Sequence, residues 1–293
     1  MTSAQHDTTA EYRRRICRAI DFLNAHLDEA PSVAQIAKAA PFSSFHFQRL
    51  FRAMLGESVG EFTRRLRLEK AARRLLFSPG DDITSIAIDL GFSSSQNFAK
   101  AFKKHFDVSP TEYRSQQQIL SKETGEPNWT DVSSTMVGDV SVVRLPERRV
   151  VYIRHFGSYN DAGVQGAFES LTRWAKQRGL DEWTHYLGVP WDDLDVSSEE
   201  RCRFDACLTV GEQTHVGPQI NHQVLPAGQY ATYHCEITNH DFELPWTRLM
   251  RDWLPGSGYQ PADGPRLEFY HSDGSDDEQG RWDLEVALPV ETL

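Results

Sequence analysis

Cysteine is scarce in this chain, and its few copies form no recognisable motif. The 293 residues include only Cys17, Cys202, Cys207 and Cys235, and no two of them have CxxC spacing. The eleven histidines show no metal-ligand spacing either. Scattered cysteines of this kind are expected to be free, buried thiols in a reducing compartment. We therefore expect no bound metal and no cofactor.

Long hydrophobic runs are also lacking. A membrane-spanning helix needs about 18 or more predominantly apolar residues, and no segment approaches that length. The first residues, MTSAQHDTTAEYRRR, contain no apolar stretch of the kind that a secretion signal requires. We therefore expect a soluble, cytoplasmic chain with no membrane partner.

Positive charge is in deficit over the whole chain, but not in both of its halves. The formal net charge is −11, which taken alone argues against a nucleic-acid partner. Residues 1–120 nevertheless contain 17 Lys and Arg against 13 Asp and Glu, whereas residues 121–293 contain 14 against 29. The length allows two domains, each with its own core. A mildly basic N-terminal domain restores DNA as a candidate partner.

Two short helices around a glycine turn are predicted in residues 83–114. Apolar residues recur at helical spacing up to Leu90, Gly91 can adopt a positive φ in the turn, and a serine run offers the next N-cap. The second helix divides into two faces. The apolar face carries Phe98, Ala101, Phe102 and His105, and the outward face carries Gln96, Asn97, Lys100, Lys103 and Lys104. An outward row of Gln, Asn and Lys is typical of a helix that reads DNA.

The same pattern occurs about fifty residues earlier, in residues 32–54. On the second helix of this copy Phe45, Gln48, Arg49 and Arg52 face away from the apolar side. An outward Phe fits a surface on which an apolar edge meets a thymine methyl group, while Gln or Arg meets adenine or guanine. We interpret the two copies as two DNA readers.

A long helix over residues 59–77 is expected to space the two readers. Two recognition helices held about one DNA turn apart, ~34 Å, could enter successive major grooves on one face of the duplex. Such a chain would read an asymmetric site without dimerising. The alternative for either copy alone is an amphipathic helical domain with solvated charges, and the duplication argues against it.

The motifs FHFQRLF, RRLRLEKAARRLL and LGFSSSQNFAKAFKKHFDVSPTEYR closely resemble the all-α double helix-turn-helix domain of AraC/XylS-type transcription regulators. The resemblance covers about 100 residues. It implies that the base or phosphate contacts are made by Phe45, Gln48 and Arg49 in the first reader and by Ser95, Gln96, Asn97 and Lys100 in the second.

One position departs from this family. Pro41 stands where the first turn of the family usually carries glycine. Because the proline ring fixes φ near −65°, the residue should not adopt the left-handed conformation of a glycine. We therefore expect the first turn to differ in shape from the second.

A linker and a second domain follow. Residues 115–137 are polar and lack sustained periodicity, which favours a linker. Residues 138–293 are expected to repeat the order strand-strand-helix-strand-strand, with helices near residues 168–178 and 244–254. Leu145-Pro146 corresponds to Leu225-Pro226, and Arg203-Phe204-Asp205 corresponds to Arg281-Trp282-Asp283, at an offset of about 80 residues. The repeat predicts an α+β domain of two half-sheets, related by a pseudo-twofold axis, with a cleft between them.

Strand alternation predicts which side chains face that cleft. Glu268, Tyr270 and Glu285 are expected together on one face, opposite the helix-packed core. Trp191 and Tyr152 occupy matching segments of the first repeat and are expected to wall a pocket for a flat or apolar ligand. A buried glutamate would favour a cationic ligand. The alternative is a solvated polar face.

The segments LPERRVVYIRHFGSY, RFDACLTV, LPAGQYATYHCEI and WDLEVALPV resemble the GyrI-like small-molecule-binding domain, a duplicated α/β module often fused to regulators. This resemblance covers about 155 residues and implies that Glu268 lies at the base of a ligand cleft. Together the two resemblances predict a transcription regulator rather than an enzyme. Residues 1–114 would bind promoter or operator DNA, residues 138–293 would bind an amphipathic or cationic effector, and RNA polymerase would be a further contact.

Two alternatives remain open. Some GyrI-like domains resemble hydrolases, in which Glu268 or Glu285 beside Tyr270 would act as the acid or base. No nucleophile-base pair is visible in the sequence, which disfavours this reading. The acidic half could instead be an interaction module without a ligand, which docks a protein partner or inhibits the basic half.

Overall fold

The computed structural model describes residues 3–78, 80–123, 140–180, 186–194, 196–238, 241–272 and 280–293. The chain divides into two compact units, Met1–Val132 and Ser133–Leu293. The division falls inside the segment that the sequence predicts as a linker.

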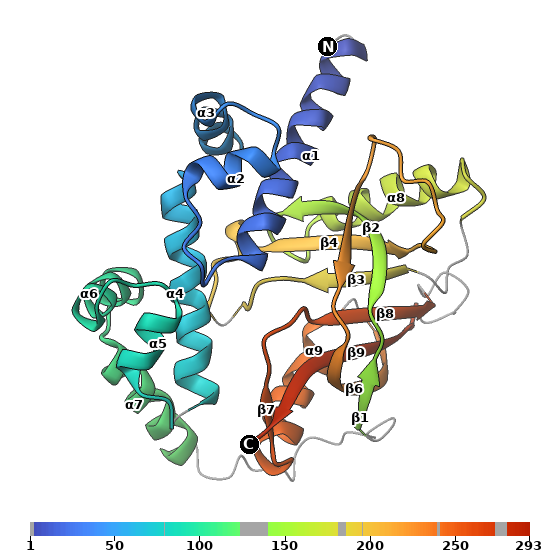
Figure 1. Cartoon of the computed structure of the whole chain (residues 1–293). Helices are drawn as coiled ribbons and strands as arrows, with labels where there is room; N and C mark the ends of the chain where they lie inside the picture. The colour runs from blue at the N-terminus through green and yellow to red at the C-terminus, as the bar shows by residue number, and fades with distance from the viewer. Residues whose placement is uncertain are drawn as a thin grey trace. The chain divides into compact units, whose positions relative to one another are not determined.

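The first unit is helical throughout its described part. Its α4 packs against α3 of the first helix-turn-helix pair and against α5 and α6 of the second pair, and it lies between the two pairs in Figure 1. Helix starts coincide with side chains that can cap them, because an N-cap oxygen accepts a hydrogen bond from a backbone N–H of the first turn. The helices are α1 (Ser3–Ala25), α2 (Val33–Ala39), α3 (Ser44–Leu55), α4 (Val59–Phe77), α5 (Ile83–Asp89), α6 (Ser95–Phe106) and α7 (Pro110–Glu123), and the side chains of Ser32, Ser43, Ser58, Asp82 and Ser94 cap α2 to α6.

The apolar faces of the two recognition helices pack inward as the periodicity predicts. Phe47 and Phe51 of α3 and Phe98 and Phe102 of α6 are at most 1% exposed. His105, which the pattern assigns to the same face as Phe102, is exposed instead. Its expected place is taken by the last residue of α6, Phe106, whose ring packs against Phe102 with centroids 4.5 Å apart.

The two turns share one hydrogen-bonding pattern. Phe42 donates its N–H to the carbonyl of Ala37, and Phe92 donates to the carbonyl of Ala87. Gly91 has a φ of +73° and Pro41 a φ of +23°. Pro41 thus departs from the φ near −65° that the sequence predicts, and the two turns close with the same backbone hydrogen bond.

Helix α7 extends beyond the predicted end of the DNA-binding domain. The first turn of α7 is closed by a capping box, in which Ser109 donates its N–H to Glu112 Oε2 and Glu112 donates its N–H to Ser109 Oγ. The helix then runs to Glu123, so the predicted linker begins inside a helix. Residues 124–137 of that linker lie outside the described residues, and the domain boundaries remain a proposal.

The described part of the second unit is built on a nine-stranded antiparallel sheet. The strand order is β1-β6-β9-β8-β3-β4-β2-β5, and β7 pairs with the far end of β9. The strands are β1 (Ser141–Leu145), β2 (Arg148–Phe156), β3 (Tyr186–Pro190), β4 (Arg203–Thr209), β5 (Asn221–Leu225), β6 (Gly228–Ile237), β7 (Tyr259–Pro261), β8 (Leu267–Ser272) and β9 (Trp282–Thr292).

The register confirms the predicted duplication. The first strand of each repeat pairs with the other repeat, because Leu145 of β1 lies opposite Gly228 while Leu225 of β5 lies opposite Arg148. These two pairs match at the predicted offset. At the centre β3 pairs with β8, and Gly188 lies opposite Glu268 on the pseudo-twofold axis. The two half-sheets are thus joined into one sheet, contrary to the expectation of a cleft between them.

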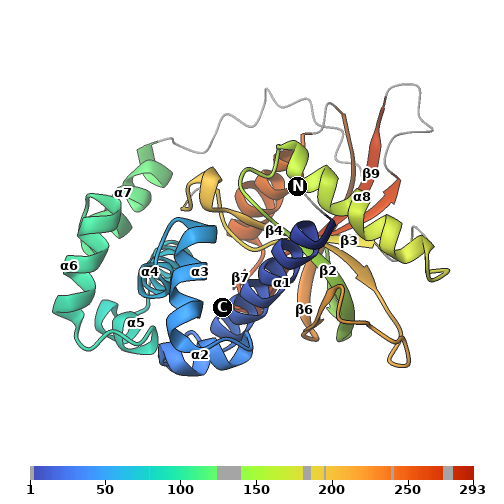
Figure 2. The ribbon, with the colours of Figure 1, turned by 90° about the horizontal axis from the view of Figure 1, so that it is seen from above.

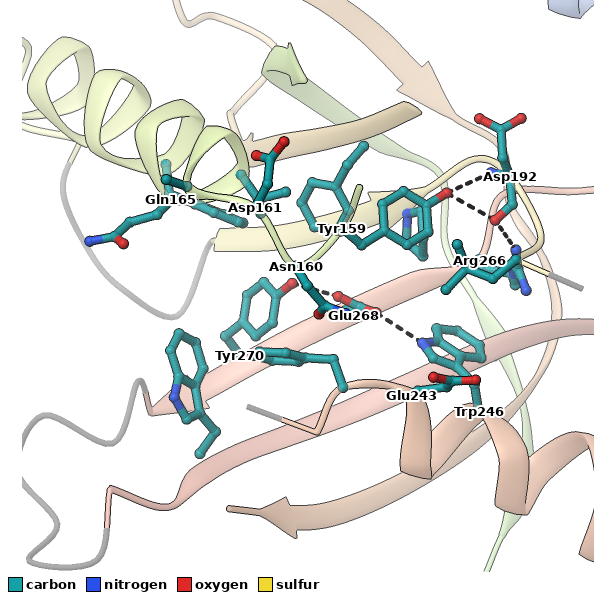
Figure 3. A pocket seen from close by; sticks show the side chains of 18 of the residues that line it. Tyr159, Asn160, Asp161, Gln165, Asp192, Glu243, Trp246, Arg266, Glu268 and Tyr270 are labelled. Carbon is teal, nitrogen blue, oxygen red and sulfur yellow. Dashed lines mark hydrogen bonds between the residues drawn. The ribbon is translucent and has the colours of Figure 1, made fainter. Parts of the chain in front are cut away.

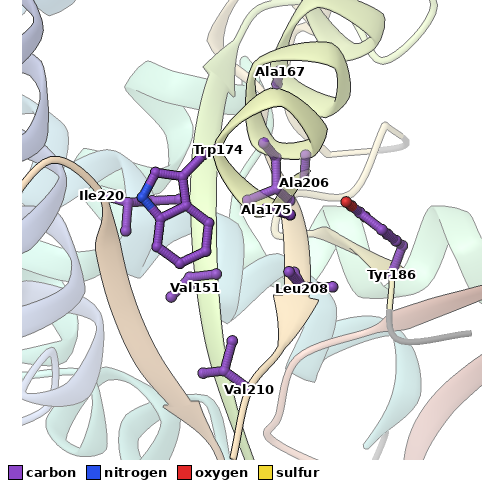
Figure 4. Packing of buried hydrophobic residues seen from close by; sticks show 10 residues of the cluster. Val151, Ala167, Trp174, Ala175, Tyr186, Ala206, Leu208, Val210 and Ile220 are labelled. Atoms are coloured by element: carbon purple, nitrogen blue, oxygen red, sulfur yellow. The ribbon is translucent and has the colours of Figure 1, made fainter. Parts of the chain in front are cut away.

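Both repeats place their helix on the same face of the sheet. Helix α8 (Ala162–Lys176) begins at its N-cap Asp161, earlier than predicted, and packs on β2 and β4. Figure 2 shows α8 alongside these strands, and Figure 4 shows Trp174 and Ala175 of α8 packed with Val151 and Ala206 in a shared apolar core. The second repeat has the short α9 (Glu243–Thr247), a π-helix η3 (Arg248–Trp253) and a 3-10 turn η4 (Leu254–Gly256) where one regular helix was predicted.

Gly91→Ala is expected to lower the free energy of unfolding of the first unit. A left-handed conformation costs alanine about 1 to 2 kcal/mol, and the added Cβ would lie 3.1 Å from Cζ of Arg67. Urea unfolding of the full chain, followed by circular dichroism, measures the loss. Gly60→Ala on α4, where no atom lies within 4 Å of the added Cβ, should instead stabilise the protein by about 0.5 to 1 kcal/mol. Identical midpoints for the two variants would contradict this account of the turn.

Candidate functional site

A cleft with a volume of about 1360 Å³ lies on the helix-covered face of the sheet in the second unit. Helix α8 lines one side with Phe168, and α9 and η3 line the other with Trp246 and Met250. Strand β8 forms the floor, from which Glu268 and Tyr270 project (Figure 3). The cleft therefore lies over the centre of the sheet, between the helices of the two repeats.

Glu268 is the charged group of the cleft floor, and it is only 5% exposed. Its Oε1 accepts a hydrogen bond from Trp246 Nε1 at 2.9 Å, and its Oε2 accepts one from the Tyr270 hydroxyl at 2.6 Å. Burial raises the pKa of Glu268, and the bonds from Tyr270 and Trp246 and the positive charge of Arg266 oppose that rise. Both donors are neutral, and among the described residues no ion pair includes Glu268. The carboxyl group is therefore held in place without a permanent cation bound to it.

Gly188 makes this arrangement possible. A Cβ at this position would meet the Tyr270 hydroxyl, would lie 2.6 Å from Cζ of Phe204, and would lie 3.1 Å from Oε2 of Glu268. A side chain at residue 188 would thus occupy the space of the Glu268–Tyr270 hydrogen bond. The two repeats therefore differ at the pseudo-twofold axis, where the first repeat has Gly188 and the second has Glu268.

Aromatic rings surround Glu268 on several sides. The Tyr270 ring meets Phe168 at a centroid distance of 5.5 Å and Trp282 at 5.9 Å, both edge to face. Phe242 packs against Trp282 with centroids 5.2 Å apart. Aromatic faces around a buried carboxylate suit a flat, positively charged ligand, since both the ring quadrupole and the carboxylate attract cations.

One end of the cleft is closed by a fixed polar cluster. The Tyr159 hydroxyl donates to the carbonyl of Asp192 at 2.9 Å, and Arg266 donates to the same carbonyl. The Asp192 carboxylate is bound by the buried Arg203 at 2.6 Å. The Arg266 guanidinium also lies 5.6 Å from the ring centroid of Trp246. This end of the cleft therefore contains a cation of its own, and the space above Glu268 is what remains for a ligand.

Six of the predicted DNA-reading side chains of the first unit lie on the outward faces of α3 and α6. Ser95 is half-buried at the start of α6, and the side chain of Phe45 lies outside the described residues. Asn97 Nδ2 donates to Ser93 Oγ at 2.7 Å, which orients its amide. The exposed members of the predicted set are Gln48, Arg49, Arg52, Gln96, Asn97 and Lys100.

The model of the GyrI-like small molecule binding domain matches residues 138–291, more than half of the chain. The chain belongs to the GyrI-like family. A helix-turn-helix domain model matches residues 36–116, which include most of the first helix-turn-helix pair and all of the second. The protein thus combines a DNA-binding domain with a small-molecule-binding domain, and the predicted architecture of a ligand-responsive transcription regulator is confirmed.

Relatives of each part are known. A DNA gyrase inhibitor of Serratia proteamaculans is 36% identical over 157 residues, which cover 50% of this chain and 97% of that protein. One of Yersinia enterocolitica is 30% identical over 156 residues, covering 51% and 96%. Among solved structures, an AraC-type regulator from Chromobacterium violaceum is 29% identical over 35% of this chain and 91% of its own, with a TM-score of 0.34. An EcmrR–DNA complex covers 85% of this chain and 83% of its own at 16% identity, with a TM-score of 0.43.

The GyrI-like cleft lies on the face opposite to the one predicted. Residues directly opposite in antiparallel strands point to the same face, and Glu268 lies opposite Val286 whereas Phe269 lies opposite Glu285. Glu285 therefore projects from the other face and does not share the cleft with Glu268. Both faces of the sheet carry apolar rows, so hydrophobicity alone did not reveal which row faces the helices.

Trp191 and Tyr152 also lie away from the GyrI-like cleft, and their predicted role as its walls is wrong. Asp205 accepts hydrogen bonds from Trp191 Nε1 at 2.8 Å and from Arg154 Nε at 2.6 Å, and the Arg154 guanidinium lies 5.1 Å from the Tyr152 ring centroid. These groups form a buried polar cluster on the other face of β2 and β4. The cleft walls that the sequence reading missed are Phe168, Phe242, Trp246 and Trp282. The sequence could have indicated Phe168 and Trp246 as cleft residues, because each is an aromatic residue in the helix of its repeat.

No helix of the described residues is long and apolar enough to cross a membrane. In the same part of the chain, no three His, Cys, Asp or Glu side chains are grouped so that they could hold a metal ion. The four cysteines are buried thiols.

Gly188→Ala is expected to destabilise the second unit by about 1 to 3 kcal/mol, because the added methyl group forces apart a packed contact that has no free space. The variant should also separate Tyr270 from Glu268. Thermal unfolding followed by circular dichroism measures the effect. The matched control is Gly166→Ala on α8, where nothing lies within 4 Å of the added Cβ. If Gly188→Ala melts at the wild-type temperature, the close approach of β3 and the Glu268 carboxyl group is not as described.

Proposed function

We propose that this protein controls transcription from a promoter in response to a lipophilic cation that binds above Glu268. The observation that supports the proposal is a buried carboxylate with neutral hydrogen-bond donors inside an aromatic cleft. A carboxylate in this setting gains more from a cationic ligand than an exposed one, since water screens it less. The ligand would also be in contact with several ring faces.

The ligand can act on transcription only if it binds one state of the protein better than another. Differential affinity for two arrangements of the chain would shift their populations, and with them the affinity for DNA or the contact with RNA polymerase. We place this activity in the cytoplasm, where promoter DNA is found. The base and phosphate contacts proposed for the first unit are the exposed α3 and α6 side chains together with Phe45 and Ser95.

Glu268→Gln is expected to weaken the binding of tetraphenylphosphonium, a lipophilic cation, about tenfold or more, which corresponds to ~1.4 kcal/mol. The amide keeps the shape and removes the charge. Because burial raises the pKa of Glu268, wild-type affinity should fall as the pH is lowered through that pKa, since protonation removes the same charge. Isothermal titration calorimetry of the full chain measures both effects.

The control for this titration is Glu243→Gln, which removes an exposed carboxylate from the rim of the same cleft. It should change the affinity by less than about threefold, because exposed charges are screened. A Glu268→Gln variant that binds the cation as tightly as the wild type, or an affinity independent of pH, would refute the proposed role of Glu268.

Lys100→Ala is expected to flatten the salt dependence of DNA binding. Each phosphate neutralised contributes about −0.9 to the slope of log K against log salt concentration, so losing one contact should change the slope by about that amount. Fluorescence anisotropy with a duplex selected from a random pool by the wild-type chain gives the slope. Lys176→Ala, which removes one positive charge from the other unit, should leave the slope unchanged. Equal slopes for wild type and Lys100→Ala would exclude a phosphate contact at Lys100.

A further inference from the structure

The two helix-turn-helix pairs are connected through α4, which packs against α3 of the first pair and against α5 and α6 of the second. Figures 1 and 2 show α1 beside α2 and α3, and away from α6. A fixed relation between the two recognition helices can therefore be transmitted by α4 and by the groups it holds.

Arg67 of α4 bonds to one backbone carbonyl in the connection that leads into the first pair and to one in the turn of the second pair. Its Nε and Nη2 donate to the carbonyl of Leu27 at 3.2 and 2.8 Å, in the connection that leads from α1 to α2. Its Nη1 donates to the carbonyl of Gly91 at 3.3 Å, in the turn that leads into α6. A guanidinium is a planar group with N–H donors in fixed directions, so one side chain sets the positions of two carbonyls at once.

Gly91 permits this close approach. A Cβ at residue 91 would lie 3.1 Å from Cζ of Arg67, so a larger residue there would displace the guanidinium from its place against the turn. The first turn is held in a related way, because Arg15 of α1 donates to the carbonyl of Pro41 at 3.3 Å. Arg15 and Arg67 each hold a turn from a long preceding helix, but Arg67 also reaches Leu27, in the connection that leads into α2 of the first pair.

We infer that Arg67 is the positioning residue that fixes α6 relative to α3, and that it thereby sets the number of base pairs the protein requires between its two half-sites. The inference rests on the proposed reading of DNA by both helices. One extra base pair between half-sites displaces the second by about 3.4 Å and rotates it by about 35°. Readers held in a fixed relation lose binding energy on such a DNA, whereas readers released from each other can follow the displaced half-site.

The experiment compares affinities for three duplexes derived from a sequence that the wild-type chain selects from a random pool. They are the selected duplex, the same duplex with one base pair inserted between the half-sites, and a duplex with one half-site only. We expect the insertion to weaken wild-type binding about tenfold, the size of the penalty for one mismatched base pair. Arg67→Met, which keeps an unbranched apolar stem but no donor, should reduce that penalty to about threefold or less. Affinity for the single half-site should not change.

Two further variants separate positioning from other roles. Arg67→Lys keeps the charge but lacks the planar pair of donors, so it should relax the spacing requirement as Arg67→Met does; a wild-type spacing requirement in Arg67→Lys would overturn the inference in favour of charge alone. Arg64→Ala removes an exposed arginine from the same helix and should leave the insertion penalty unchanged.

The outcomes that overturn the inference differ from those that overturn the proposed function. An insertion penalty equal in Arg67→Met, Arg67→Lys and the wild type removes the positioning role and leaves DNA reading intact. A wild-type chain that binds the duplex with the inserted base pair as tightly as the selected duplex would likewise remove the positioning role and leave DNA reading intact. A variant that merely unfolds would lose affinity for the single half-site as well, and Arg67→Lys then provides the deciding comparison. A wild-type chain that selects no sequence would overturn both proposals.

Discussion

The pairing of β3 with β8 is the interaction on which the second unit depends. It joins two repeats into one sheet, and it does so at a point where the chains approach so closely that Gly188 has room for no side chain. The same approach places Glu268 at the centre of the sheet, under the space between the helices of both repeats. The cleft and its charged floor are thus consequences of how the repeats are joined rather than of either repeat alone.

In the first unit a helix, α4, joins the two copies. This unit too contains a duplicated motif, and the copies are related through α4 and through the Arg67 guanidinium, which bonds to a carbonyl on each side. In both units a glycine lies at the junction, Gly91 against the Arg67 guanidinium and Gly188 against the Glu268 and Tyr270 side chains. Each unit therefore contains two similar surfaces, and the contacts at the junction set the position of one surface relative to the other.

Much of this organisation could be predicted from the sequence. Helical periodicity and N-cap residues located the two helix-turn-helix pairs, since Phe47 and Phe98 recur at equivalent places and both are buried. Matching Leu-Pro and Arg-aromatic-Asp segments located the repeat of the second unit. Glu268 and Tyr270 were expected to lie together, and the structure brings them within hydrogen-bonding distance.

The predictions that were wrong concern features set by residues far apart in the sequence. The side on which Glu285 projects is set by the register between β8 and β9, and no local pattern reveals it when both faces are apolar. Trp191 was assigned to a pocket because it is aromatic, whereas its indole N–H is bound to Asp205 on the other face. Pro41 has a φ of +23°, where the sequence predicts a value near −65°.

The two repeats of the second unit exchange their first strands, so each repeat depends on the other for a complete half-sheet. Strand β1 completes the half-sheet of the later repeat, and β5 completes that of the earlier one. A single repeat released from its partner would carry a strand with nothing to pair with and a vacant edge that needs one. Two copies of such a repeat could satisfy each other by the same exchange, as in a domain-swapped homodimer. The unit therefore has the form of a symmetric dimer enclosed in one chain, except that its two axial residues, Gly188 and Glu268, are different.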